Sequence, residues 1–157
     1  FTMMRRFLFF VGLLFIAIWF LTRSVPIPEN IVYGVTFSVP YARDTLGLEW
    51  QKVYLAILDE LKVKHLRIPA YWTEHEPEKG QYNFSDLDFM LREAERRGAD
   101  VILAIGQKLP RWPECHIPLW ANQQSRQDRH REFLLYLDKA VERYKNNKAI
   151  RYWQVVN

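Results

Sequence analysis

Three glutamates stand two residues apart in the segment WTEHEPEKGQYNF, which covers residues 72–84: Glu74, Glu76 and Glu78. Two carboxyl groups held at a fixed separation can act as acid and base, or as acid and nucleophile, in the hydrolysis of a glycosidic bond. The same spacing in a segment with a proline and a glycine is also typical of a solvated turn. We expect the turn, with all three carboxylates in solvent.

Arg67 is the second residue whose position suggests chemistry, because it stands between Leu66 and Ile68 in the apolar run VKHLRIP. A buried guanidinium inside such a strand needs an acidic partner. The run itself contains no acid, so the partner must come from another segment, across the mouth of the fold. A purely structural ion pair is the alternative interpretation.

Aromatic residues gather where the predicted strands end. Flat rings with a polar edge suit stacking on sugar faces, although ordinary core packing uses the same residues. We take four of them as candidates for substrate binding: Tyr71, Trp72, Trp112 and Trp153.

Metal or disulfide chemistry has little support in the sequence. Glu114, Cys115 and His116 are adjacent potential ligands, but no second cluster has the matching spacing of a metal site. Cys115 is the only cysteine, so no intrachain disulfide can form. We therefore expect neither a metal nor a cofactor.

The elements that must position these residues alternate between strands and helices. Helical spacing of apolar residues predicts helices at 50–61, 85–97 and 133–144, the second with Ser85 as its N-cap and Gly98 as its stop. A long loop should run from Gln107 to about Gln127. Apolar runs predict four strands, at 31–37, 63–69, 100–106 and 151–157; Pro69 should stop the second, and the third and fourth should be buried.

This alternation implies an α/β fold with a parallel sheet. A doubly wound sheet and a TIM barrel both fit, and the absence of a G-x-G-x-x-G segment after the first strand weakens the dinucleotide-binding version of the former. A (β/α)₈ barrel needs about 250 residues. The sequence therefore predicts the first half of a TIM barrel, the first four strands, in residues 31–157.

The N-terminus predicts a membrane or signal helix. An uncharged apolar run from Phe7 to Leu21 follows Arg5 and Arg6 and precedes Arg23. Its length lies between that of a signal-peptide core and that of a spanning helix. We expect an uncleaved signal-anchor over residues 1–24, with a cleaved signal peptide as the alternative, a linker at 25–30, and a location at the cell membrane or outside the cell. Without residues 1–28 the chain is almost neutral, which argues against nucleic acid as a partner.

Several segments together resemble the clan A glycoside hydrolases, the cellulase-like TIM-barrel superfamily. They are VKHLRIPAYWTEHEPEKGQYNFSDLDFML (63–91), VILAIGQKLPRWP (101–113) and the terminal YWQVVN (152–157). The shared features are an R-I-P strand, a tryptophan after it, an E-P-x-x-G-x-Y-x-F turn into the next helix, and a fourth strand that ends in asparagine.

The resemblance implies a retaining hydrolase of β-linked glycans, in which a glutamate after strand four is the acid and base and a glutamate after strand seven is the nucleophile. It also implies that Arg67 orients the nucleophile, that Asn157 binds the sugar 2-hydroxyl, and that Trp72 and Trp112 form walls of the sugar site. The first glutamate would directly follow Asn157, and the second would lie further on.

We therefore expect a glycan substrate for the parent protein and no glycosidase activity from these 157 residues alone. A non-catalytic carbohydrate-binding or degenerate half-barrel is the alternative, and an unrelated TIM-barrel enzyme is a further one.

Overall fold

The chain divides into two units, residues 1–31 and 32–157, which we describe separately. The structure is a computed structural model that describes residues 2–23, 31–111 and 114–155. The first unit contains α1 (Thr2–Thr22), a helix long and apolar enough to cross a membrane, a property that signal sequences share. The predicted linker at 25–30 lies outside the described residues.

The second unit is built on a parallel four-stranded sheet with the strand order β1-β2-β3-β4. Consecutive strands are therefore neighbours, and the order never reverses. A doubly wound sheet contains such a reversal, whereas the strands of a TIM barrel follow one another as they do here. The strands are β1 (Val35–Thr36), β2 (His65–Tyr71), β3 (Asp100–Gly106) and β4 (Ile150–Val155).

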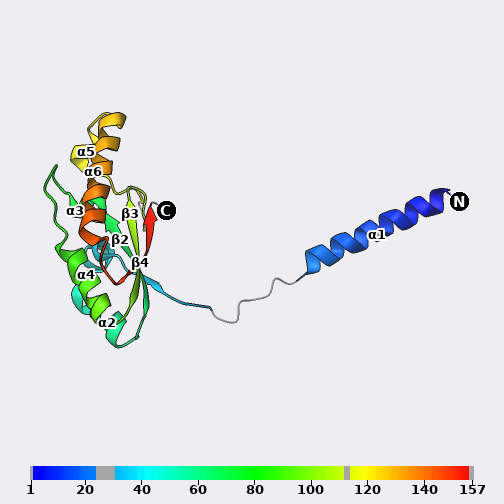
Figure 1. Ribbon diagram of the computed structural model, residues 1–157, viewed down its shortest axis with the longest axis horizontal. Coiled ribbons are helices and arrows are strands. Elements are labelled where there is room, and N and C mark those ends of the chain that lie inside the picture. Colours follow the sequence, from blue (N-terminus) through cyan, green and yellow to red (C-terminus); the bar gives the residue numbers. More distant parts are fainter. Residues whose placement is uncertain (1, 24–30, 112–113, 156–157) are drawn as a thin grey trace. The chain divides into compact units, whose positions relative to one another are not determined.

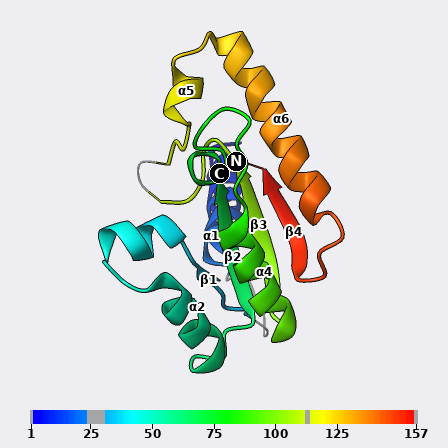
Figure 2. The same ribbon diagram turned by 90° about the vertical axis from the view of Figure 1, so that its left-hand side faces the viewer.

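The helices of this unit cover one face of the sheet, as Figure 1 shows, and α2, α4 and α6 follow one another across that face in Figure 2. This one-sided arrangement is that of a barrel wall, whose opposite face would be the barrel interior. The elements between the strands are the π-helix η1 (Tyr41–Thr45), α2 (Trp50–Asp59), α3 (Trp72–His75), α4 (Ser85–Arg96), α5 (Leu119–Asn122) and α6 (Arg126–Tyr144).

The core lies between the sheet and these helices. Alternate strand residues such as Ile68 and Leu103 are completely buried there, because successive side chains of a strand point to opposite faces. Two buried tyrosines join elements through their hydroxyls. Tyr54 of α2 donates to the Met90 carbonyl of α4 at 2.9 Å, and Tyr136 of α6 donates to the Ala70 carbonyl of β2 at 2.8 Å.

The opposite face of the sheet is exposed along the first part of the strands. Ile102 is 38% exposed and Tyr152 is 63% exposed, and a concavity of about 570 Å³ lies over them. The predictions of a fully buried third strand and a buried fourth strand are therefore wrong. Near the ends of the strands the loop after β3 does cover this face, where Tyr71, Ala104 and Leu109 form a small second cluster.

The boundaries of two elements differ from prediction for identifiable reasons. Pro69 does not stop β2, which continues to Tyr71. The backbone carbonyl of Arg67 points towards β1 and accepts a hydrogen bond from the Phe37 N–H at 3.1 Å. The backbone of Pro69, two residues further on, faces the same neighbour, but β1 has already ended at Thr36. The N–H that proline lacks therefore costs no hydrogen bond between strands. Ser85 is the first helical residue rather than the N-cap, and its N–H donates to the Asn83 Oδ1 at 3.0 Å.

Substitution of Gly34 by alanine should destabilise the start of β1. A Cβ at this position would lie 2.6 Å from the His65 carbonyl oxygen, a backbone atom that cannot turn away. We expect Gly34→Ala to lower the free energy of unfolding by about 1–3 kcal/mol, measured by urea denaturation in mild detergent. Gly12→Ala is the control because nothing lies within 4 Å of its added Cβ; equal stability of the two variants would contradict the prediction.

Candidate functional site

The candidate site lies at the edge of the sheet where the parallel strands end. Tyr71, Gly106 and Val155 are the last residues of β2, β3 and β4, and the register pairs Tyr71 with Gly106. The carboxyl ends of parallel strands meet at one edge, which is where TIM-barrel enzymes carry their active sites.

Arg67 lies on the open face of the sheet, opposite the helices, where its Nε donates a 2.9 Å hydrogen bond to Gln154 Oε1. The bond spans β3, because Gln154 pairs with Ala104 and Ala104 pairs with Pro69. One hydrogen-bond partner of Arg67 is therefore the side-chain amide of Gln154 in β4, where the sequence predicted an acid.

Gln154 is a site residue that the sequence analysis missed. It is the one polar side chain within the run YWQVV, and it faces the same side of the sheet as Arg67. Gln154 stands between the apolar residues Trp153 and Val155, as Arg67 stands between Leu66 and Ile68. A polar side chain in such a strand needs a partner, and this signal could have identified Gln154.

Tyr71 also belongs to the open face but is 2% exposed. Its hydroxyl donates to the Pro110 carbonyl at 2.8 Å and lies 3.0 Å from Ser38 Oγ, and its ring centroid is 4.0 Å from that of His116. Burial raises the pKa of the Tyr71 phenol, so the hydroxyl stays protonated. The loop after β3 covers this ring, which leaves it no face for stacking on a sugar.

Trp72 and Trp153 lie on the helix side of the sheet rather than with Arg67. Trp72 is 0% exposed and packs against Trp120, Phe133 and Tyr136, so it is a core residue and not a wall of a sugar site. Trp153 pairs with Leu103, which faces the helices, and remains 37% exposed because β4 is an edge strand. Trp112 and Asn157 lie outside the described residues.

The three loop glutamates have three different environments. Glu74 accepts a 3.0 Å hydrogen bond from Arg43, and Glu78 is exposed and accepts from the Gln81 amide at 2.6 Å. Glu76, by contrast, is 1% exposed. The prediction of a solvated turn therefore fits Glu78 and is wrong for Glu76.

The Glu76 carboxylate ties the loop to the core. Oε2 accepts a 2.7 Å hydrogen bond from Trp72 Nε1, and Oε1 accepts a 2.9 Å hydrogen bond from the Gly80 N–H. The Glu76 backbone carbonyl accepts another from Trp120 Nε1 at 3.1 Å. Burial and the neighbouring Glu76 carboxylate raise the pKa of Tyr82 to about 12. The hydrogen bonds of the Glu76 carboxylate to Trp72 and Gly80 therefore give it a structural role in this loop.

No metal centre is formed by the part of the chain that the structure describes, since no group of three His, Cys, Asp or Glu residues there could hold an ion. Glu114 and His116, two of the three adjacent candidate ligands, make other contacts, His116 with the Tyr71 ring. Glu114 Oε2 lies 3.5 Å from Lys108 Nζ, and Cys115 is exposed.

The buried His75 and the half-buried His116 should make the stability of this region depend on pH. The ring of His75 is 5% exposed and its Nδ1 lies 3.0 Å from the Asn83 carbonyl, which fixes Nδ1 as the donor of a neutral ring. Burial lowers the pKa of His75 and of His116.

Because these pKa values are lower in the folded than in the unfolded chain, the unfolded chain binds more protons once the pH falls below about 6.5. The stability that neutral histidines contribute is complete above pH 7 and is lost as the pH falls, by up to about 1.4 kcal/mol per histidine and pH unit. We expect His75→Gln to flatten the dependence of the unfolding free energy on pH between pH 7 and 5.5, measured by urea denaturation at each pH. A pH dependence that His75→Gln does not alter would contradict this prediction.

Comparison with known proteins adds to this geometry. The family model Glyco_hydro_42, described as beta-galactosidase, matches residues 48–130, which is more than half of the chain. The chain belongs to glycoside hydrolase family 42. A search of curated proteins found no match.

Solved structures of glycoside hydrolases share the fold of this family 42 chain. The beta-galactosidase of Rahnella sp. R3 is 17% identical with a TM-score of 0.60, over 82% of this chain and 22% of its own. A catalytic mutant of Gan42B, a GH42 beta-galactosidase from G. stearothermophilus, is 21% identical with a TM-score of 0.60, over 81% and 21%. GH5_18 from Streptomyces cattleya, in complex with GlcNAc, is 14% identical with a TM-score of 0.59, over 79% and 33%.

The family match and these structures confirm the resemblance to clan A glycoside hydrolases and the parallel α/β architecture of TIM-barrel hydrolases. The chain spans about a fifth of the length of the two beta-galactosidases and a third of the GH5_18 protein.

Proposed function

We propose that the chain forms the first four β/α units of a retaining glycoside hydrolase that acts on β-linked glycans. The observation that carries the proposal is the pairing of Arg67 with Gln154 on the open face of a parallel sheet whose strands do not reverse order. In a closed barrel this face becomes the interior, so Arg67 would point towards the site at the carboxyl ends of the strands.

The roles proposed for the residues are those that the resemblance to clan A glycoside hydrolases implies. Arg67 positions the nucleophile and keeps it ionised, Asn157 binds the sugar 2-hydroxyl, and the acid and base is a glutamate that directly follows Asn157. Because neither catalytic glutamate lies within these 157 residues, the fragment itself does not hydrolyse glycosides.

The proposal also includes the location. The apolar helix α1 supports a membrane anchor or an export signal, with the second unit outside the cytoplasmic membrane. Fractionation with protease treatment of intact cells distinguishes an external from an internal catalytic unit, and N-terminal sequencing of the mature protein shows whether α1 is removed.

The decisive experiment reads the coding sequence after Asn157 and assays the complete protein on nitrophenyl β-galactoside. We expect a glutamate codon at once, hydrolysis by the complete protein, and a loss of at least about 100-fold in kcat/KM for Arg67→Lys, because lysine lacks the planar guanidinium.

Arg151→Lys is the matched control, since this exposed arginine stands at the other end of β4. Glycan binding without turnover would support a carbohydrate-binding role instead. Equal activity of the Arg67 and Arg151 variants would contradict the role of Arg67.

A further inference from the structure

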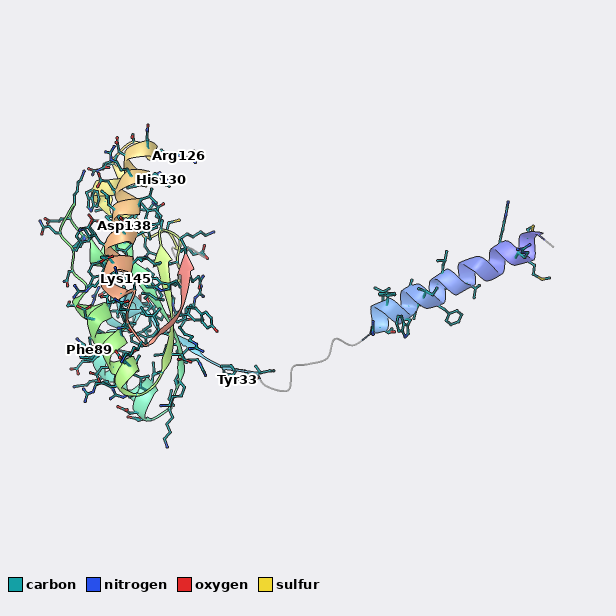
Figure 3. All side chains as sticks on the ribbon, viewed as in Figure 1. Tyr33, Phe89, Arg126, His130, Asp138 and Lys145 are labelled. Atoms are coloured by element: carbon teal, nitrogen blue, oxygen red, sulfur yellow. The ribbon has the colours of Figure 1, made fainter. Side chains whose placement is uncertain are left out.

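A second concave region lies beside the candidate site and is lined by basic and amide side chains. Its volume is about 590 Å³, and its lining consists of Gln107, Arg126, Gln127, Arg129 and His130. Gln107 directly follows β3, and the other four residues lie in the first turn and a half of α6. Figure 3 shows Arg126 and His130 at the beginning of that helix.

This pocket lies at the catalytic end of the fold. The chain leaves β3 at Gly106, enters α6 at Arg126 and returns along α6 to the beginning of β4 at Ile150. The start of α6 is therefore at the edge of the sheet where the strands end, the same edge to which Tyr71 belongs.

The pocket is lined by positively charged side chains and by no negatively charged ones. Arg126, Arg129 and His130 are spaced i, i+3 and i+4, which places them on one face of α6, and no carboxylate lines the pocket. The acids nearby are engaged elsewhere: Asp128 accepts from Ser125 Oγ at 2.7 Å and from Arg131 at 2.9 Å, and Glu132 accepts from Lys79 at 2.8 Å.

Like charges at this spacing destabilise a helix unless an anion lies between them. Arg129 donates through one nitrogen to the Asn122 Oδ1 at 3.3 Å, which leaves other donors on the same guanidinium for a ligand.

The helix itself adds to the positive potential. Ser125 caps α6 by accepting the Asp128 N–H at 3.1 Å, so the N–H groups of Arg126 and Gln127 precede the first intrahelical bond and carry the positive end of the helix dipole. Two arginines, two amide side chains and a helix N-terminus together match a carboxylate or a sulfate ester, which accept several charge-assisted hydrogen bonds.

We propose that this pocket binds an anionic substituent of the glycan, a carboxylate or a sulfate, beside the sugar at the catalytic edge. The inference rests on the proposed function for its glycan and names the substrate class as acidic rather than neutral. Gln107 connects the pocket to the end of β3, so an acidic sugar held by Arg126 and Arg129 would be continuous with a chain of sugars at that edge.

The test measures binding to the full chain in mild detergent, without any turnover. The probes are galacturonate, galactose 6-sulfate, galactose and inorganic sulfate, titrated by calorimetry at low salt. We expect both acidic sugars to bind at least tenfold more tightly than galactose, and the difference to shrink as salt is added. The relative affinities of galacturonate and galactose 6-sulfate identify the natural anion.

The double variant Arg126→Gln/Arg129→Gln should abolish this tenfold preference. The matched control Lys139→Gln/Arg151→Gln removes the same charge from exposed residues outside the pocket and should retain the preference. Circular dichroism should show the same helix content in both double variants as in the unchanged chain.

Three results would overturn the inference: equal binding of galactose and the acidic sugars, binding of inorganic sulfate as tight as that of the sugars, or equal losses in the two double variants. Failure of the hydrolase assay in the previous section would leave these binding results intact, and the two proposals are therefore tested separately.

Discussion

Glu76→Ala is expected to lower the free energy of unfolding by about 3 kcal/mol. The carboxylate is 1% exposed and accepts hydrogen bonds from Trp72 Nε1 and the Gly80 N–H. Alanine leaves both donors without this acceptor in a buried environment, and each orphaned donor costs about 1–3 kcal/mol. Urea denaturation followed by circular dichroism in mild detergent measures the change.

Glu78→Ala is the matched control, because Glu78 lies in the same loop but is exposed. We expect it to change the stability by no more than about 0.5 kcal/mol. Glu76→Gln should fall between the two, since an amide oxygen replaces only one of the two acceptors. A Glu76→Ala variant as stable as Glu78→Ala would show that the loop is not tied to the core through this carboxylate.

Trp72→Ala is expected to destabilise the chain by about 3–5 kcal/mol, because it removes a large, completely buried side chain from a cluster of aromatic rings. Trp72→Phe keeps an aromatic ring but loses the donor to Glu76, and should cost less than the alanine variant. The measurement is again urea denaturation, with circular dichroism as the signal because the fluorescence of Trp72 is itself lost.

Trp153→Ala is the comparison for Trp72, since Trp153 is 37% exposed on an edge strand. It should cost less than half as much. If Trp72→Ala instead left stability unchanged and weakened glycan binding by the complete protein, Trp72 would be a wall of the sugar site, as the family resemblance implied.

The clan A superfamily was recognisable from sequence because its signals are local. The R-I-P strand, the following turn and the amphipathic helices are carried by contiguous residues, and α4 ends at Arg96, just before Gly98 with its φ of +61°. The strand β3 has the predicted bounds for the same reason, an apolar run between a polar residue and glycine. Strand order was not readable, since two sheet arrangements share this alternation.

Individual site residues were predicted less well because their roles depend on contacts across the sequence. Gln154 lies 87 residues from the Arg67 that donates to it, and Tyr71 is covered by a loop that returns to it through Pro110 and His116. Glu76 and Glu78 stand in the same turn, yet one is buried and the other is in solvent.

The sequence by itself therefore determined an α/β chain of clan A type, with an apolar N-terminal helix and an arginine inside its second strand. The tertiary structure decided which face of the sheet each aromatic residue occupies, which carboxylate is buried, and that Arg67 meets an amide of β4. The physical reason is that hydrophobic periodicity is encoded between neighbours in the chain, whereas a side chain's burial and partners depend on which distant segments pack against it.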